Sequence, residues 1–305
     1  MPLPAVSFAR ASTVGLGHVR RAAALGGALA LAATGALTSA SVASAAESGG
    51  TYVALGDSYT SGPLIPLQSG GLCLRSSVNY ASLMAADLGY SLVDASCAGA
   101  TTDNMAQDQT DFGSVINPPE LDALTGGTSL VTLGIGGNDI GFSDIIETCA
   151  GESLTDPFGD PCTAHYTVGG TDQLLAAIHA TGPKVAAVLR EIHQRSPHAA
   201  VYVVGYPDIL PEDSDGCWPI VPIAYGDVAY LRQTETELNA MLAGVADANG
   251  ATYVDTYTPT VGHDVCRPVG VKWIEGLIPT SPAAPFHPNA LGEAAMAKAL
   301  ESAIG

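Results

Sequence analysis

Five short apolar runs constrain the fold of this chain more than any other feature of its sequence. They alternate with longer stretches in which apolar residues recur at helical intervals. The runs span residues 52–56, 91–94, 129–135, 200–204 and 252–255. The third run is almost continuously apolar, which is typical of a parallel strand that helices cover on both faces. This alternation predicts a parallel sheet between two helical layers, with right-handed crossovers.

The stretches between and after the runs predict four main helices. They cover residues 79–89, 172–195, 223–248 and 288–304. Gly89 is a plausible C-cap, Gly182-Pro183 predicts a break in the second helix, and Pro288 suits the first position of the last. We expect one or two short helices within residues 103–124. The remaining long stretches, 63–78, 149–170 and 256–285, are predicted to be mostly irregular.

The first apolar run ends abruptly in Gly56-Asp57-Ser58. In open α/β sheets, ligands bind beyond the carboxyl ends of the strands, so this turn would present Ser58 at the functional edge. A serine placed there can react. Gly-Asp-Ser is also ordinary turn chemistry, and the tripeptide alone does not decide between the two interpretations.

Three further blocks lie at strand ends or helix starts: 97–100 with Gly99, 136–139 with Asn138, and 285–289 with His287. A serine hydroxyl needs a base to remove its proton as it attacks a carbonyl. Histidine titrates near neutrality and is the preferred candidate, although His287 could also be a surface residue at a helix entrance. His263 is the rival base. We expect a structural or rim role for it, because it precedes no helix and adjoins Cys266.

Several other site classes lack their motifs. Thr60 stands where the elbow of α/β-hydrolases has its second glycine, and no Gly-Lys-Ser/Thr phosphate loop occurs. The sequence has no Cys-x-x-Cys and no paired histidine spacing, so we expect no metal.

Taken together, the four blocks resemble the SGNH, or GDSL-type, hydrolase family, and further details are similar to its secreted actinobacterial lipases and esterases. The resemblance covers nearly all of residues 46–305. It implies a three-layer α/β/α sandwich around a flavodoxin-like, five-stranded parallel sheet of order 2-1-3-4-5. It also implies that Ser58 is the nucleophile and His287 the base. The oxyanion hole would consist of the backbone N–H groups of Ser58 and Gly99 and the side-chain amide of Asn138, without a cofactor.

The sequence departs from the family pattern beside the histidine. Many members carry an aspartate three residues before it, where this chain has Ala284. We therefore predict a Ser58–His287 dyad in which a main-chain carbonyl from residues 281–285 accepts the histidine N–H. The alternative is that a distant acid orients the ring. The candidates are Asp57, Asp139 and Asp264.

Six cysteines all follow residue 45 and imply disulfides formed in an oxidising compartment. Fifteen pairings are open to six cysteines, and sequence alone does not choose among them. The family resemblance suggests nearest-neighbour pairing. The pairs would be Cys73–Cys97, Cys149–Cys162 and Cys217–Cys266.

Residues 1–45 have the layout of an export signal. Three arginines precede an alanine-rich apolar run, and Ala43-Ser44-Ala45 follows as a cleavage signal. The sequence leaves open whether the route is general secretory or twin-arginine. Removal of this segment would leave one catalytic domain, residues 46–305, and would lower the formal charge from −19 to −22, because only the three arginines are lost. Such a charge disfavours nucleic acid and anionic membrane surfaces.

We therefore expect a secreted, monomeric serine esterase or lipase without a stable membrane anchor. Its substrates would be acylglycerols, phospholipids or similar lipid esters. Two alternatives remain at this point: a carbohydrate deacetylase of the same family, and a non-catalytic module that binds lipid or glycan.

Overall fold

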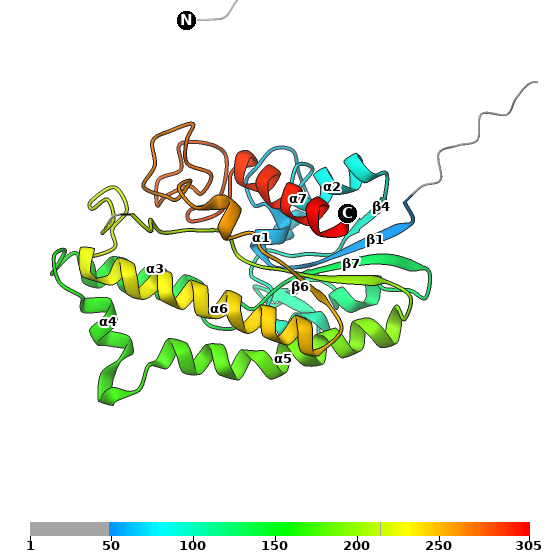
Figure 1. Ribbon diagram of the computed structural model, residues 1–305, viewed down its shortest axis with the longest axis horizontal. Coiled ribbons are helices and arrows are strands. Elements are labelled where there is room, and N and C mark those ends of the chain that lie inside the picture. Colours follow the sequence, from blue (N-terminus) through cyan, green and yellow to red (C-terminus); the bar gives the residue numbers. More distant parts are fainter. Residues whose placement is uncertain (1–48, 214) are drawn as a thin grey trace, which may run out of the picture. The chain divides into compact units, whose positions relative to one another are not determined.

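A parallel sheet of five strands runs through the computed structural model, which describes residues 49–213 and 215–305 (Figure 1). Its strands, in chain order, are β1 (Thr51–Gly56), β4 (Ser91–Asp94), β7 (Thr128–Gly134), β8 (Ala200–Val204) and β9 (Thr252–Val254). In space they follow the order β4-β1-β7-β8-β9. Numbered along the chain, this is the predicted order 2-1-3-4-5, and the prediction is confirmed.

The register of β1 against β7 brings two functional turns to one edge. Leu55 lies opposite Leu133 and Gly56 opposite Gly134, so the two strands end at the same level. The N–H of Asp57 then donates to the carbonyl of Gly134 at 3.0 Å. The turn that follows β1 therefore begins directly beside the turn that follows β7.

Helices cover both faces of the sheet, as Figure 1 shows. One face packs against α2 (Tyr80–Leu88) and α7 (Ala290–Ile304), and the other against α5 (Gln173–Arg195) and α6 (Val228–Ala248). Alternate side chains of β1 pack toward the two helical layers. Tyr52 and Ala54 lie in the core on the side of α2 and α7, and Val53 and Leu55 lie in the core on the side of α5 and α6. The three-layer α/β/α sandwich is thus confirmed.

Helix ends follow local capping chemistry where the sequence offers it. The side chain of Asn79 caps α2 by accepting the N–H of Ser82, and Gly89 closes the helix in the left-handed conformation. The prediction for Pro288 was wrong, because α7 begins at Ala290. Asn289 takes the N-cap, where its side chain accepts two helix N–H groups, and this leaves Pro288 outside the helix.

The predicted break at Gly182-Pro183 was also wrong. The helix α5 continues through Pro183, with Gly182 buried against Met241 of α6. The packing of α5 on α6 therefore outweighs the hydrogen bond that proline cannot donate.

Among the short elements of the described residues, two 3₁₀ turns correspond to the short helices expected within residues 103–124, and the others were not predicted. Residues 149–170, predicted to be irregular, contain the end of α3 (Phe142–Ser153) and all of α4 (Pro161–Tyr166). Two short hairpins also occur, together with α1 and six 3₁₀ turns. These are β2 (Gln68–Ser69) with β3 (Arg75–Ser76), β5 (Gln109–Asp111) with β6 (Ser114–Asn117), α1 (Ser58–Ser61), η1 (Gly71–Cys73), η2 (Thr102–Met105), η3 (Glu120–Ala123), η4 (Val168–Gly170), η5 (Tyr225–Asp227) and η6 (Thr258–Thr260).

Three disulfides link segments that lie mostly between the strands of the sheet. The structure pairs Cys73 with Cys97, Cys149 with Cys162 and Cys217 with Cys266, the pairs that the family resemblance suggests. The Cys73–Cys97 bridge joins the loop after α1 to the turn after β4. It therefore lies two residues from Gly99.

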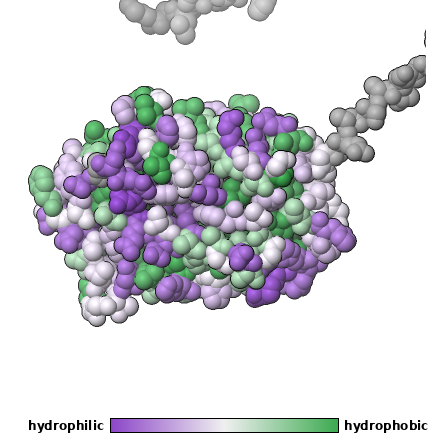
Figure 2. All heavy atoms as spheres, viewed as in Figure 1, coloured by the Kyte–Doolittle hydropathy of each residue, from purple (hydrophilic) through white to green (hydrophobic). Residues whose placement is uncertain are grey.

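The predicted export signal, residues 1–45, lies outside the described residues. Every helix within 49–213 and 215–305 is too short or too polar to span a bilayer. Figure 2 shows hydrophilic and hydrophobic residues interspersed over the viewed face.

Candidate active site

Ser58 is the first residue of α1 and directly follows the turn at the carboxyl end of β1. Asp57 is the N-cap of this short helix, and its Oδ1 accepts the N–H of Tyr59 at 2.9 Å. Gly56 has φ +151°, and a Cβ there would clash with the Gly134 carbonyl and the Thr60 hydroxyl. The sharp turn that presents Ser58 therefore requires glycine at position 56.

His287 lies in hydrogen-bond contact with Ser58. Its Nε2 is 2.8 Å from the Ser58 Oγ, and its Nδ1 is 2.7 Å from the carbonyl oxygen of Pro285. A carbonyl can only accept, so Nδ1 carries the proton and donates it to Pro285. Nε2 is then the acceptor for the serine hydroxyl, which is the tautomer that a general base requires.

The loop that carries His287 is fixed by main-chain hydrogen bonds and by the residue next to Ser58. Phe286 is buried with φ +59°, and its carbonyl accepts the Tyr59 hydroxyl at 2.6 Å. The loop also exchanges two main-chain hydrogen bonds with Glu275, from Phe286 N–H and to the His287 carbonyl. The imidazole stacks on Tyr59 with ring centroids 4.8 Å apart and meets the ring of Phe142 at 6.1 Å.

These aromatic neighbours remove water from the imidazole. Burial lowers the pKa of His287 from its usual 6.5 to about 4, although the hydrogen bond to Pro285 opposes the shift. At neutral pH the ring is therefore uncharged and able to accept a proton.

The carboxylates that could have oriented the histidine are bonded elsewhere. Asp57 Oδ2 accepts the Tyr206 hydroxyl at 2.6 Å, and burial raises the pKa of Asp57 to about 7. Asp139 accepts the N–H of Thr102 at 2.9 Å. Asp264 binds Arg267 Nε at 2.7 Å through one oxygen and the N–H of Cys266 through the other.

Glu275, which is close to His287 in sequence, is also engaged. Its Oε2 lies 2.8 Å from Lys272 Nζ, and its Oε1 accepts the Asn289 side chain at 2.9 Å. These contacts lower the pKa of Glu275 to about 2 against the effect of its burial. The acid therefore supports the loop by bonds to its neighbours, while the imidazole N–H goes to the main chain.

The predicted oxyanion donors lie in the turns that follow three adjacent strands. Gly99 follows β4 with φ +81°, and Asn138 follows β7, with its side-chain Nδ2 donating to the carbonyl of Ala100 at 2.9 Å. This leaves the second amide hydrogen of Asn138 free for another acceptor. Among the described residues, the N–H groups of Ser58 and Gly99 have no acceptor. Because β4, β1 and β7 are neighbours, the predicted donors come from turns at one edge of the sheet.

The sequence analysis did not identify four residues that support the site. Glu120 accepts the N–H of Gly56 at 2.7 Å, Tyr206 accepts the N–H of Gly137 at 2.7 Å, and Tyr59 and Phe142 pack on the imidazole. Only Tyr59 gave a local signal, since it follows Ser58 directly. The other three reach the site from distant segments.

His263, the rival base, is bonded within its own loop. Its Nδ1 is 2.6 Å from the Val271 carbonyl, and its ring stacks on Trp273. Ser58 thus meets His287 and not His263. Within the described part of the chain, no group of three or more His, Cys, Asp or Glu side chains could hold a metal ion.

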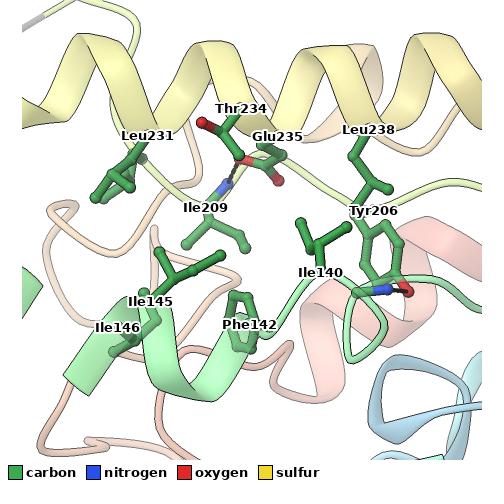
Figure 3. A pocket seen from close by; sticks show the side chains of 12 residues that line it. Ile140, Phe142, Ile145, Ile146, Tyr206, Ile209, Leu231, Thr234, Glu235 and Leu238 are labelled. Atoms are coloured by element: carbon green, nitrogen blue, oxygen red, sulfur yellow. Dashed lines mark hydrogen bonds between the residues drawn. The ribbon is translucent and has the colours of Figure 1, made fainter. Parts of the chain in front are cut away.

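An apolar pocket adjoins this site (Figure 3). Gly137, Phe142 and Tyr206 form the wall nearest the serine and histidine, since Phe142 contacts the imidazole and Gly137 precedes Asn138. The remaining wall comes from the turn after β7, α3, the loop after β8 and α6. It includes Ile140, Ile145, Ile146, Ile209, Leu210, Leu231 and Leu238.

The arrangement of a serine, a neutral histidine and convergent donors is chemistry for acyl transfer. The sequence profile of the GDSL-like lipase/acylhydrolase family matches residues 54–295. The chain belongs to this family. Its family makes it a carboxylic ester hydrolase, as the sequence resemblance implied.

The chain is similar to lipases and a phospholipase of Streptomyces. Lipase 2 of Streptomyces coelicolor is 38% identical over 310 residues, which cover 100% of this chain and 99% of the relative. The crystal structure of phospholipase A1 from Streptomyces albidoflavus NA297 has 28% identity and a TM-score of 0.70, covering 83% of this chain and 99% of that one. The extracellular lipase from Streptomyces rimosus gives 28% identity and a TM-score of 0.69 over the same shares.

Proposed function

We propose that this hydrolase cleaves lipid esters, such as acylglycerols or phospholipids, through an acyl-enzyme on Ser58. The observation that carries the proposal is the continuous hydrogen-bond chain from Ser58 Oγ through His287 to the Pro285 carbonyl. The apolar pocket beside it supports a substrate with a hydrocarbon chain. The lipase and phospholipase A1 named among the relatives agree with this substrate class.

In the first half-reaction, Ser58 Oγ attacks the ester carbonyl carbon while His287 Nε2 takes the hydroxyl proton. Negative charge develops on the former carbonyl oxygen, where the N–H groups of Ser58 and Gly99 and the amide of Asn138 stabilise it. The tetrahedral intermediate then collapses. The bond to the leaving oxygen breaks, and His287 gives its proton to the departing alcohol.

In the second half-reaction, water attacks the acyl-Ser58 carbonyl and His287 takes one of its protons. The acid product leaves and Ser58 recovers its hydrogen from His287. Throughout, the Pro285 carbonyl holds the Nδ1 hydrogen, which keeps the ring in the required tautomer and orientation. A neutral acceptor stabilises the transient imidazolium less than a carboxylate would.

A carbohydrate deacetylase would use the same four groups, but an acetyl group does not need an extended apolar pocket. A non-catalytic module does not agree with the family. We further propose that the protein acts outside the cell as a monomer, in line with its three disulfides, the predicted export signal and the extracellular lipase among the solved structures.

A fluorophosphonate probe tests the nucleophile, because it should label Ser58 and no other residue. Peptide mapping of the labelled protein identifies the site. A series of p-nitrophenyl esters of increasing chain length tests the substrate class. Lipid-ester hydrolysis predicts that kcat/KM rises beyond acetate, whereas a maximum at acetate would favour the deacetylase.

A further inference from the structure

One carboxyl group, that of Glu235, lies in the wall of this mainly apolar pocket. Glu235 projects from α6, and its Oε2 accepts the N–H of Ile209 at 3.3 Å (Figure 3). Its Oε1 is buried and has no hydrogen-bond partner among the described residues. A polar atom in this state costs free energy unless a partner arrives, so it is a feature to explain.

The protonation state of Glu235 determines which hydrogen bonds it can form. Burial, reinforced by the nearby carboxyl of Asp208, raises the pKa of Glu235 well above its usual value. A neutral carboxyl at this place can both donate and accept one hydrogen bond. A hydroxyl group has the same two capacities and carries no charge into the apolar surroundings.

The position of the pocket indicates that it binds the acyl part of the substrate. Gly137 precedes the proposed oxyanion residue Asn138, so the pocket begins beside the carbonyl carbon that Ser58 attacks. The leaving alcohol must lie within reach of His287, which protonates it and meets Phe142 at the near wall of the pocket, so we assign the deeper part of the pocket to the other half of the ester. The group that extends along Phe142 and Ile140 toward Glu235 is therefore the chain attached to the carbonyl carbon.

We propose that this pocket takes an acyl chain bearing a hydroxyl group, and that Glu235 Oε1 hydrogen-bonds that hydroxyl. The inference rests on the proposed function of the Ser58 site and specifies its substrate class. The preferred ester is then that of a hydroxylated acid, and plain acyl chains leave Glu235 unsatisfied. Glu235 is a specificity-determining residue and takes no part in the bond-breaking steps.

The test compares p-nitrophenyl dodecanoate with the set of its monohydroxy isomers, at constant alcohol. The isomer whose hydroxyl reaches Glu235 should show a kcat/KM about tenfold above the plain ester, because it satisfies a buried group that the plain chain leaves unpaired. Equal or lower kcat/KM for every isomer in the wild-type enzyme would overturn the inference.

Two substitutions assign the preference to the carboxyl group. Glu235→Leu should abolish it, measured as the ratio of kcat/KM for the hydroxylated ester to kcat/KM for the plain ester. Glu235→Gln should keep part of it, because the amide oxygen can still accept the Ile209 N–H while the NH₂ group faces the pocket. Glu237→Leu removes an exposed carboxylate from the same helix and should leave the preference unchanged.

The outcomes separate this inference from the proposed function. A preference that persists in Glu235→Leu would place the hydroxyl site elsewhere and sink the inference. Hydrolysis of the plain ester without any isomer preference would retain lipid-ester hydrolysis and reject the role of Glu235. If the wild-type enzyme hydrolyses no member of the set, the proposed function fails and takes this inference with it.

Discussion

Ser58 and His287 are separated by 229 positions in the chain, yet their side chains meet at 2.8 Å. Tyr59, the residue next to the serine, stacks on the imidazole and binds the carbonyl of Phe286. One turn therefore both presents the hydroxyl and holds the ring that would activate it. Ser58 and His287 could be selected from sequence because they lie in compact local motifs. Tyr206 and Glu120 could not, because their contacts with the turn form only after folding.

The first prediction concerns the nucleophile. Ser58→Ala should lower kcat/KM for p-nitrophenyl esters by about 10⁴-fold or more, since no other group can form the acyl-enzyme. Thermal unfolding should stay close to that of the wild type, because the hydroxyl lies at the rim of the sheet. Full activity in this variant would remove Ser58 from the mechanism.

The second concerns the group that orients His287. His287→Ala should cost on the order of 10⁴ in kcat/KM, whereas Asp139→Asn, Asp264→Asn and Glu275→Gln should each cost less than about tenfold. The reason is that all three acids bond to other groups, while Nδ1 donates to Pro285. Thermal melts of each variant separate lost stability from lost chemistry. If Asp264→Asn lowered kcat/KM about as much as His287→Ala while the fold stayed intact, the dyad interpretation would be wrong and Asp264 would belong to a triad.

The third is a pH profile. The base must be neutral, and burial lowers the pKa of His287 to about 4. Values of kcat/KM should therefore stay nearly level from about pH 8 down to about pH 6 and fall only at more acidic values. Circular dichroism at each pH shows where the fold is intact. If kcat/KM instead falls around the usual pKa of histidine, the ring of His287 is hydrated in solution.

At the scale of elements, the sheet strands were the most predictable part of the fold. All five apolar runs became strands within one or two residues of their predicted bounds. The signal is clearest for β1 and β7, because a strand buried on both faces has little choice of composition. The helices α3 and α4 were missed because both are short and lie in a segment, residues 141–170, that glycines and prolines interrupt repeatedly. Their positions are set by a disulfide and by packing against the rest of the chain.

The fourth prediction uses the disulfides. Replacing Cys73 and Cys97 with serine should lower the free energy of unfolding by roughly 2–4 kcal/mol. It should also lower kcat/KM, because the bridge anchors the turn of Gly99 and the N–H of Ala98 donates to Cys73. The matched control replaces Cys149 and Cys162, which tie α3 to α4. Equal losses of kcat/KM in both variants would show that the effect is one of general stability.

At the scale of the whole molecule, buried acids set the response of stability to pH. Burial raises the pKa values of Asp57 and Asp208 to about 7 and those of Glu120, Glu235 and Glu293 well above normal. An acid with a raised folded pKa contributes stability below its unfolded pKa and loses it as the pH rises through the folded pKa. The lowered pKa values of His287, Glu275 and Asp213 act in the opposite sense, but mainly below neutral pH.

The fifth prediction follows from this balance. The melting temperature should fall by several degrees between about pH 5 and about pH 8. Added salt should reduce only the share of this fall in melting temperature that comes from repulsion among surface acids. Asp208→Asn should flatten the slope, because it removes a buried carboxyl whose two oxygens have no partner among the described residues. A melting temperature that rises over this range would contradict the prediction.

The acceptor for the imidazole N–H is a main-chain atom two residues from the histidine itself. Mutation therefore affects this acceptor differently from a side-chain acceptor. A side-chain carboxylate is lost by a single base change in its codon. A peptide carbonyl is encoded by no codon, so point mutation can displace it only by reshaping the loop. An enzyme with such an acceptor has a weaker partner for its base, but replacing one side chain does not remove that acceptor directly.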